Sequence, residues 1–328
     1  MIFGISLLIL SCNQEKRTEY IKLSGEAQGT TFFICYSDTL NRDFSKDIET
    51  ILTEFDNEVS TYRPNSIISQ FNDNQLDTLF GSEYKYLPAC FVLSQRMNEN
   101  TNGYFDAGLA PLIDYSKSFP DSIGNSNGFD SMRQINTRFI SNRDYITKID
   151  NRSQFNFNAV AQGYSVDVIC YFLKTNGIEN YMVEIGGEVK VRGNNKDGVP
   201  WTISLEAPNS TVKNRKVQES ISLKNKSVVT SGSYRKFKEI NGIKYSHAIN
   251  PKTGLGVTHN LLSVSVITEE CAIADALATA FLVMGKEETI RFLDNNNQYK
   301  VSLLFIESKE DGTFESSFYG GFEEYLLE

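Results

Sequence analysis

The sequence has few histidines, few prolines and no pair of cysteines at a metal-binding spacing. Its 328 residues include 2 histidines, 7 prolines and 5 cysteines. With so few histidines and no C-x-x-C pattern, a zinc site built from cysteine and histidine is disfavoured. Apart from Cys12, the cysteines lie among apolar or small residues. This favours buried free thiols over the single disulfide that an oxidising compartment would allow, and the residues concerned are Cys35, Cys90, Cys170 and Cys271.

Basic residues are also scarce. The chain has 32 lysines and arginines against 41 aspartates and glutamates, which gives a formal net charge of −9. Because nucleic acids are bound by clustered basic side chains, we expect no nucleic-acid partner. The sequence also lacks a G-x-G-x-x-G pattern, a Walker A pattern and any internal apolar run long enough to span a bilayer. A Rossmann or P-loop nucleotide site is therefore disfavoured, and an anionic substrate would need a metal ion or backbone amides.

The N-terminus is the one markedly apolar segment. Ile2–Leu10 is almost wholly apolar, and Ser11 and Cys12 follow it. This pattern is typical of a lipoprotein signal peptide that is cleaved before a cysteine that then carries lipid. We therefore expect a signal peptide over residues 1–11, a polar tether over 12–24 and one domain over 25–328. The protein would be exported and held by Cys12 on a membrane, facing the periplasm. The alternative is a hydrophobic N-terminus with an incidental cysteine.

The rest of the chain predicts an α+β fold, because strands come in runs with helices between them and no solenoid repeat is present. Apolar spacing predicts helices over Asp43–Glu58, Leu87–Thr101, Ala159–Gly177 and Glu270–Met284. Runs of β-branched and aromatic residues predict strands over Thr30–Tyr36, Tyr181–Ile185, Val189–Arg192, Trp201–Glu206, Ser220–Leu223, Ser227–Thr230, Leu261–Thr268 and Val301–Ile306.

Asp275 and Thr279 form the first candidate site. A spacing of four residues places both oxygen-bearing side chains on one helix face, in a segment that is otherwise small or apolar. A buried carboxylate needs a cationic partner, and carboxylate and hydroxyl oxygens suit Mg²⁺. The alternative is an aspartate stabilised by the helix dipole and a threonine bonded to the preceding turn.

His247 is the second candidate. It stands between a strand-like segment and a Pro-x-x-Gly turn that begins at Pro251. A histidine held in this way can act as a general base near neutral pH. The alternative is a structural histidine, which is how we interpret His259.

Three further segments could contact a ligand through their backbone. Gly186-Gly187-Glu188 would allow close approach to a ligand, or would form a bulge between strands. Thr230–Tyr234 would supply hydroxyls and free amides to a phosphate or adenine, or would form a turn. The segment Asn156–Asp167 leaves a strand and opens a helix, where N–H groups can bind an anion; the alternative is an asparagine cap.

Together and in this order, these segments resemble the FAD:protein FMN transferases of the ApbE family. The matching segments are Gln28-Gly29-Thr30, Ser60-Thr61-Tyr62 to Ser66, Gly103–Asp106 to Pro111-Leu112, Asn156–Asp167, Gly186-Gly187-Glu188, Thr230–Tyr234, His247–Gly254 and Ala274–Thr279. The similarity runs from about residue 25 to the C-terminus, and the lipoprotein leader also fits the family. The resemblance implies an ApbE-like α+β fold, in which mixed or antiparallel sheets pack against helices.

The resemblance also implies Mg²⁺ as cofactor and FAD as substrate. The implied metal ligands are the side chains of Asp275 and Thr279 and the backbones of Ala159 and Ala278. His247 corresponds to the catalytic histidine of the family. The residues implied to touch FAD are Gln28, Tyr62, Tyr104, Phe105, Asp106, Asn156, Gln162 and Ile249.

The chain differs from the family pattern at four positions. Gln28 replaces the usual Met, Asn156 the usual Asp, Gln162 the usual Lys or Glu, and Asn250 the Asp that commonly precedes the proline. These changes lower the charge around the flavin and the base. They concern binding and rate more than the class of reaction.

The implied reaction is Mg²⁺-dependent cleavage of FAD, in which FMN moves to a Ser or Thr hydroxyl and AMP leaves. His247 would take the proton of that hydroxyl. The acceptor would be a protein of a membrane redox complex with a Ser/Thr flavinylation motif. Two alternatives remain: a Mg²⁺-dependent FAD pyrophosphatase that gives FMN and AMP, and a non-catalytic periplasmic flavin-binding lipoprotein, which would need no base.

Overall fold

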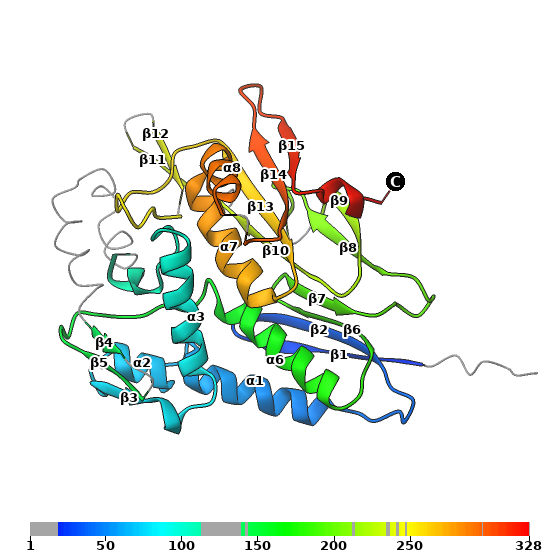
Figure 1. Ribbon diagram of the computed structural model, residues 1–328, viewed down its shortest axis with the longest axis horizontal. Helices are drawn as coiled ribbons and strands as arrows, with labels where there is room; N and C mark the ends of the chain where they lie inside the picture. The colour runs from blue at the N-terminus through cyan, green and yellow to red at the C-terminus, as the bar shows by residue number, and fades with distance from the viewer. Residues whose placement is uncertain are drawn as a thin grey trace, which may run out of the picture.

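An antiparallel sheet of eight strands runs through the centre of the computed structural model (Figure 1). The structure describes residues 19–112, 139–141, 144–211, 214–233, 237–240, 243–246, 248–296 and 298–327. In spatial order the strands are β1 (Tyr20–Ala27), β2 (Thr30–Ser37), β6 (Asn180–Ile185), β7 (Glu188–Arg192), β10 (Ser227–Gly232), β13 (Leu261–Thr268), β14 (Ser302–Ser308) and β15 (Phe314–Tyr319). The expected α+β class with antiparallel sheets is confirmed.

The first strand corrects the predicted tether. β1 begins at Tyr20 and pairs along its whole length with β2, from Tyr20 opposite Ser37 to Ala27 opposite Thr30. Ile21 and Leu23 pack against the core on alternate positions, which is the period of a half-buried strand. Residues 20–24 therefore belong to the domain. The predicted signal peptide and Cys12 lie outside the described residues.

Helices cover one face of the sheet (Figure 1). They are α1 (Ser45–Val59), α2 (Ile67–Asn72), α3 (Leu87–Asn100), α6 (Ala161–Thr175), α7 (Cys271–Met284) and α8 (Lys286–Asp294). α6 packs on β6 and β7, and α7 packs on β10 and β13. Twelve of the fourteen residues of α7 are buried, so this helix runs through the core rather than along the surface. A polar residue on α7 is therefore removed from water, which is the situation of Asp275.

A hairpin of β8 (Trp201–Glu206) and β9 (Val217–Leu223) covers the opposite face of the sheet. Trp201, Ile203 and Leu205 alternate with more exposed residues along β8 and enter a second apolar cluster. The short 3₁₀ helix η4 (Phe322–Tyr325) adds the buried side chain of Phe322 to this cluster. The central sheet thus separates two cores, a large one under the helices and a smaller one under the hairpin.

The remaining elements are short. β3 (Thr78–Phe80), β5 (Tyr145–Lys148) and β4 (Phe139–Ser141) form a small sheet, and β11 (Phe237–Ile240) pairs with β12 (Ile243–Ser246). Two single 3₁₀ turns are η1 (Gly81–Glu83) and η2 (Ala107–Leu109). The segment Ser116–Asp130, whose many Ser, Gly and Asn residues predict a loop, lies outside the described residues.

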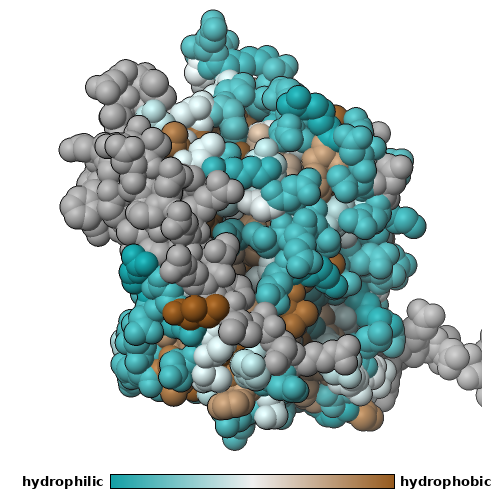
Figure 2. Space-filling model, turned by 60° about the vertical axis from the view of Figure 1, so that its left-hand side comes forward, coloured by the Kyte–Doolittle hydropathy of each residue, from teal (hydrophilic) through white to brown (hydrophobic). Residues whose placement is uncertain are grey.

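The surface and the thiols agree with the composition. The face in Figure 2 is largely hydrophilic, with apolar residues only in small groups. Within the described residues, no helix combines the length and the hydrophobicity that crossing a bilayer requires. The expected buried free thiols are confirmed for Cys35, Cys90, Cys170 and Cys271.

Candidate active site

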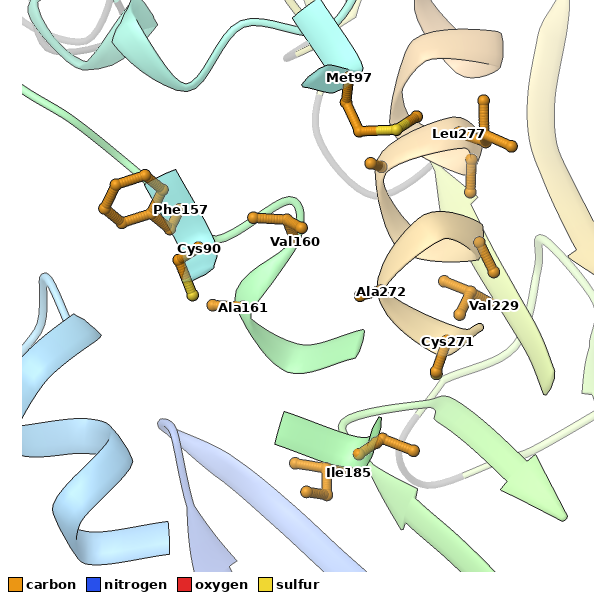
Figure 3. Packing of buried hydrophobic residues seen from close by; sticks show 14 of the residues in the cluster. Cys90, Met97, Phe157, Val160, Ala161, Ile185, Val229, Cys271, Ala272 and Leu277 are labelled. Carbon is orange, nitrogen blue, oxygen red and sulfur yellow. The ribbon is translucent and has the colours of Figure 1, made fainter. Parts of the chain in front are cut away.

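The candidate site lies where the start of α6 meets α7. The Gly163 N–H, in the first turn of α6, donates a hydrogen bond of 3.0 Å to Asp275 Oδ2. A Cβ atom on Gly163 would stand 2.5 Å from the Cys271 carbonyl oxygen and 2.8 Å from Asp275 Cβ, so only glycine allows this approach. Figure 3 shows the apolar side chains around the contact, from Val160 and Ala161 at the start of α6 to Cys271 on α7.

Asp275 is a buried carboxyl group whose charge has no ion pair. Its residue is 4 % exposed, and no lysine or arginine of the described chain forms a salt bridge with it. Burial raises the pKa of Asp275 to about 7, although the Gly163 N–H opposes this shift. The positive end of the α6 dipole also faces the carboxylate. One N–H group of the helix start that was predicted to bind an anion is therefore used by a carboxylate of the protein itself.

Glu188 is a second buried carboxyl group beside Asp275, and it was not among the predicted site residues. It is 9 % exposed, and its Oε2 has no hydrogen-bond partner within the described chain. Burial raises the pKa of Glu188, and the charge of Asp275 raises it further. The sequence signals for Glu188 were its place in the family-matching segment Gly186-Gly187-Glu188 and at the start of a buried strand.

These groups fit a divalent cation. Asp275 and Glu188 offer buried carboxylate oxygens without a cationic partner, and the Thr279 hydroxyl lies 3.4 Å from the Ser231 hydroxyl at the same helix–sheet boundary. Oxygen ligands with few charges suit Mg²⁺, which keeps positions for water and phosphate. Within the described residues, no group of three or more acidic, histidine or cysteine side chains is placed to hold a metal ion.

The other two predicted metal ligands would act through their backbones. Ala278 is fully buried on α7, one residue before Thr279. Ala159 is half-buried and lies just before the start of α6. Both positions are therefore on the two segments that meet at Asp275.

A cavity of about 420 Å³ lies beside the carboxyl pair of Asp275 and Glu188. It is lined by three of the predicted FAD residues, Gln28, Tyr62 and Gln162. Both side-chain amide atoms of Gln28 are buried without a partner in the described chain. A buried amide without partners is costly in a folded protein, so these atoms are available to a ligand. The remaining lining residues are Gly29, Thr30, Phe55, Asp56, Val59, Ser60, Asn158 and Ala161.

The β6–β7 turn joins this cavity to the carboxyl pair. Gly186 has φ of +69°, and a Cβ atom there would stand 2.5 Å from Gln162 Nε2 and 3.1 Å from Glu188 Oε2. The cavity wall formed by Gln162 and the unpaired oxygen of Glu188 therefore meet at one glycine. A side chain at Gly186 would clash with the protein itself, whereas a Cβ atom on Gly187 would meet nothing within 4 Å. The approach of this glycine pair to a ligand stays a prediction.

A strip of backbone connects the cavity with the predicted residues around Asp106. The Asn156 N–H donates to the Ala107 carbonyl at 2.8 Å, and Asn156 Oδ1 accepts from the Asn158 N–H at 2.9 Å. Asn158 Nδ2 then donates to the Tyr62 hydroxyl at 3.1 Å. Asp106 accepts from the Gly108 N–H, and burial raises the pKa of its carboxyl group. Asn156 and Asp106 are thus close to the cavity without lining it.

Tyr104, Phe105 and Ile249 do not line the cavity either. The Lys252 ammonium group lies 3.7 Å from the centroid of the Tyr104 ring, and Ile249 packs on the small cluster that includes Leu109. Phe105 is only 2 % exposed and belongs to the large core. The Phe105 N–H donates to the Thr101 hydroxyl at 3.0 Å, and its carbonyl accepts from Asn98 Nδ2 at 2.7 Å. The contact of Phe105 with FAD therefore stays a prediction.

Part of the segment Thr230–Tyr234 lies in the sheet. Thr230–Gly232 belong to β10 and pair with β13, and the Ser233 N–H donates to the Leu262 carbonyl. The contact of this segment with a phosphate or adenine stays a prediction. Only the Ser231 hydroxyl faces Thr279. His247 and Tyr234 lie outside the described residues. His259 packs against Gly285 at the end of α7, in agreement with a structural role.

Known proteins are similar to this chain over most of its length. The model of the ApbE family matches residues 28–304. A protein of Vibrio cholerae named FAD:protein FMN transferase is 33 % identical over 323 residues, which cover 95 % of this chain and 94 % of the relative. The structure of flavin transferase ApbE from Vibrio cholerae has a TM-score of 0.76 at 31 % identity, covering 94 % of this chain and all of the other. The apo form of flavinyl transferase ApbE from Pseudomonas stutzeri has a TM-score of 0.80 at 27 % identity, covering 94 % and 97 % of the two chains.

Proposed function

Because the chain belongs to the ApbE family, we propose that it is a FAD:protein FMN transferase. With Mg²⁺, it moves the FMN half of FAD to a Ser or Thr hydroxyl of an acceptor protein and releases AMP. The observation that supports this most directly is the buried, unpaired carboxyl pair of Asp275 and Glu188 beside the cavity lined by Gln28 and Gln162. A binding protein that held flavin by its rings alone would gain nothing from two such groups, which are costly to bury.

In this proposal each residue of the site has one role. Gln28, Tyr62 and Gln162 would bind FAD in the cavity that they line. Asp275 and Thr279, with the backbones of Ala159 and Ala278, would hold the metal. When bound, Mg²⁺ would neutralise the pyrophosphate oxygens and the charge that develops on them.

His247 accepts the proton of the acceptor hydroxyl. The hydroxyl oxygen bonds to the phosphorus on the FMN side, and the bond from that phosphorus to the bridging oxygen breaks. AMP leaves with the bridging oxygen, and the product is a phosphoester between FMN and the acceptor.

The location of the protein is a further part of the proposal. We propose that the apolar segment Ile2–Leu10 is removed and that lipid on Cys12 then holds the enzyme on a membrane, facing the periplasm. An acceptor in a membrane redox complex would lie within reach. Cys12→Ser should abolish incorporation of radiolabelled fatty acid and release the protein from membranes. Unchanged labelling and membrane association would contradict the anchor.

The central test is covalent flavin transfer. Purified protein is incubated with FAD, Mg²⁺ and membranes, and flavin fluorescence is then sought in protein bands on a denaturing gel. His247→Ala should lower the rate by roughly 10²–10⁴-fold, since a positioned base contributes about this much. His259→Ala is the matched control and should transfer FMN normally. Release of free FMN and AMP without labelled bands would indicate a pyrophosphatase, and intact FAD would indicate a binding protein.

A further inference from the structure

The β8–β9 hairpin leaves one strand edge open. Within the described chain β8 pairs with β9 alone. The outer edge of β9 is covered by the C-terminal segment, because Ile221 bridges to Leu326 and the Leu327 N–H donates to the Ser220 carbonyl. In an antiparallel strand every second residue turns its N–H and C=O away from its partner. The free edge of β8 can therefore accept another strand.

A groove of about 590 Å³ follows this open edge. It is lined by five consecutive residues of β8, Thr202–Glu206, and by none of β9. Consecutive strand residues point to opposite faces, so a groove that touches all five runs beside the strand rather than above it. Its floor is the hairpin side of the central sheet, with Phe33, Met182 and Val189.

The groove ends at the candidate active site. Gly186 and Gly187, in the β6–β7 turn, line the groove, and Gly186 is also the glycine that lies against Gln162 and Glu188. Thr30 lines both the groove and the 420 Å³ cavity. The two hollows thus meet at the same end of strands β2, β6 and β7, although they lie on opposite faces of the central sheet.

The groove also carries charge. Arg215 forms an ion pair of 3.4 Å with Glu206. Glu184 is half-buried, accepts the Gly187 N–H at 2.8 Å and lies near the positive charge of Arg215, but it forms no ion pair within the described chain. The residues that line the groove thus include two carboxylates, Glu184 and Glu206, and one guanidinium group. A basic side chain placed in the groove would therefore find a carboxylate near the glycine turn.

We propose that this groove binds an extended segment of the acceptor protein, which adds to β8 as a third strand. Main-chain hydrogen bonds supply affinity in this mode of recognition, and side-chain pockets supply specificity. The segment carries a basic residue opposite Glu184, and its Ser or Thr hydroxyl reaches the site past Gly186. The inference rests on the proposed transferase function and adds where the acceptor binds.

The test fills the groove without touching the FAD cavity. Thr31 is an exposed residue of β2 in the groove floor, and Ser24 is an exposed residue of β1 on the same sheet face that does not line the groove. Flavin transfer from FAD to detergent-solubilised membrane proteins is measured against their concentration. Thr31→Trp should raise the half-saturating concentration at least about tenfold, and Ser24→Trp should not change it. Mg²⁺-dependent FAD binding, followed by flavin fluorescence, should stay within about twofold of wild type in both variants.

A second variant tests the same groove with little risk to folding. Glu184→Gln keeps the oxygen that accepts the Gly187 N–H, and it should raise the half-saturating concentration about threefold or more through loss of one charge pair. The inference is overturned if folded Thr31→Trp or Glu184→Gln saturates like wild type. If the wild-type protein labels no membrane protein while FAD binding is intact, it is the proposed transferase function that fails.

Discussion

Two carboxylates in this protein accept the same kind of hydrogen bond, from an N–H group in the first turn of another helix, but they lie in opposite electrostatic surroundings. Asp167 of α6 accepts the Ala272 N–H at the start of α7 at 2.9 Å, and Asp275 of α7 accepts the Gly163 N–H at the start of α6 at 3.0 Å. The two helices thus cap one another. Asp167 also forms an ion pair with Lys190, whereas Asp275 forms no ion pair within the described chain and lies beside the carboxyl group of Glu188.

The difference separates a structural group from a functional one. The Asp167 charge is balanced by a side chain that the fold itself provides, so the contact is complete without a ligand. At Asp275 the fold provides repulsion instead, and burial raises the pKa of the carboxyl group to about 7. A group that the fold leaves uncompensated is a candidate for binding something from outside.

The largest expected effect is on the unpaired carboxylate. Asp275→Asn removes the charge and keeps the shape, so Mg²⁺-dependent FMN transfer should fall by roughly 10²-fold or more while the fold survives. The exposed Asp197 provides a control as Asp197→Asn, which should transfer normally. Flavin labelling and the circular dichroism spectrum are compared in parallel. A fully active Asp275→Asn enzyme would remove Asp275 from the metal site.

pH should act on the same group. In the metal-free protein the pKa of Asp275 is raised from 3.8 to about 7, so its contribution to stability is present in full at low pH. This contribution is lost as pH rises from about 4 to about 7. Mg²⁺ competes with the proton, and its affinity should fall about tenfold per pH unit below pH 7. Titration calorimetry at pH 5 and pH 8 checks this, with Asp275→Asn as the variant that should lose the pH dependence. A Mg²⁺ affinity independent of pH would argue against a carboxyl ligand with a raised pKa.

Glu188→Gln should have two effects of opposite sign. Loss of one buried negative charge should stabilise the metal-free protein at a pH where both carboxyl groups are ionised, because it removes the repulsion between Glu188 and Asp275. The same change should weaken Mg²⁺ binding about tenfold, because the site then offers less negative charge. Thermal unfolding with and without Mg²⁺ measures both effects. If stability and Mg²⁺ binding change in the same direction, Glu188 does not act on the metal.

The smallest effect on activity is expected for the paired carboxylate. Asp167→Asn leaves the Lys190 ammonium group partly buried without its partner, so stability should fall by about 1–3 kcal/mol. The rate of FMN transfer per folded molecule should change less than about threefold. Denaturant unfolding gives the free energy of unfolding, and the gel assay gives the rate. A selective loss of Mg²⁺ binding would show that Asp167 belongs to the site as well.

Local pattern accounts for much of the fold. Apolar spacing predicted a helix over Asp43–Glu58, and α1 spans Ser45–Val59; the strands Trp201–Glu206 and Leu261–Thr268 match β8 and β13. β1, β15 and α8 were missed. β1 and β15 are the outer strands of the sheet and are only partly buried along their length, so their patterns carry little hydrophobic signal.

The sequence by itself determined the family pattern and the low number of basic residues. It also determined that Asp275 and Thr279 lie on one face of a helix, since a spacing of four is a local property of a helix. Only the tertiary structure decided which N–H groups and charged side chains lie beside each carboxylate. Gly163 and Asp275 are 112 residues apart, and the contact exists because two helices cross where one has no side chain. The roles of Glu188, of Lys190 and of the groove along β8 depend on such contacts, which no local spacing encodes.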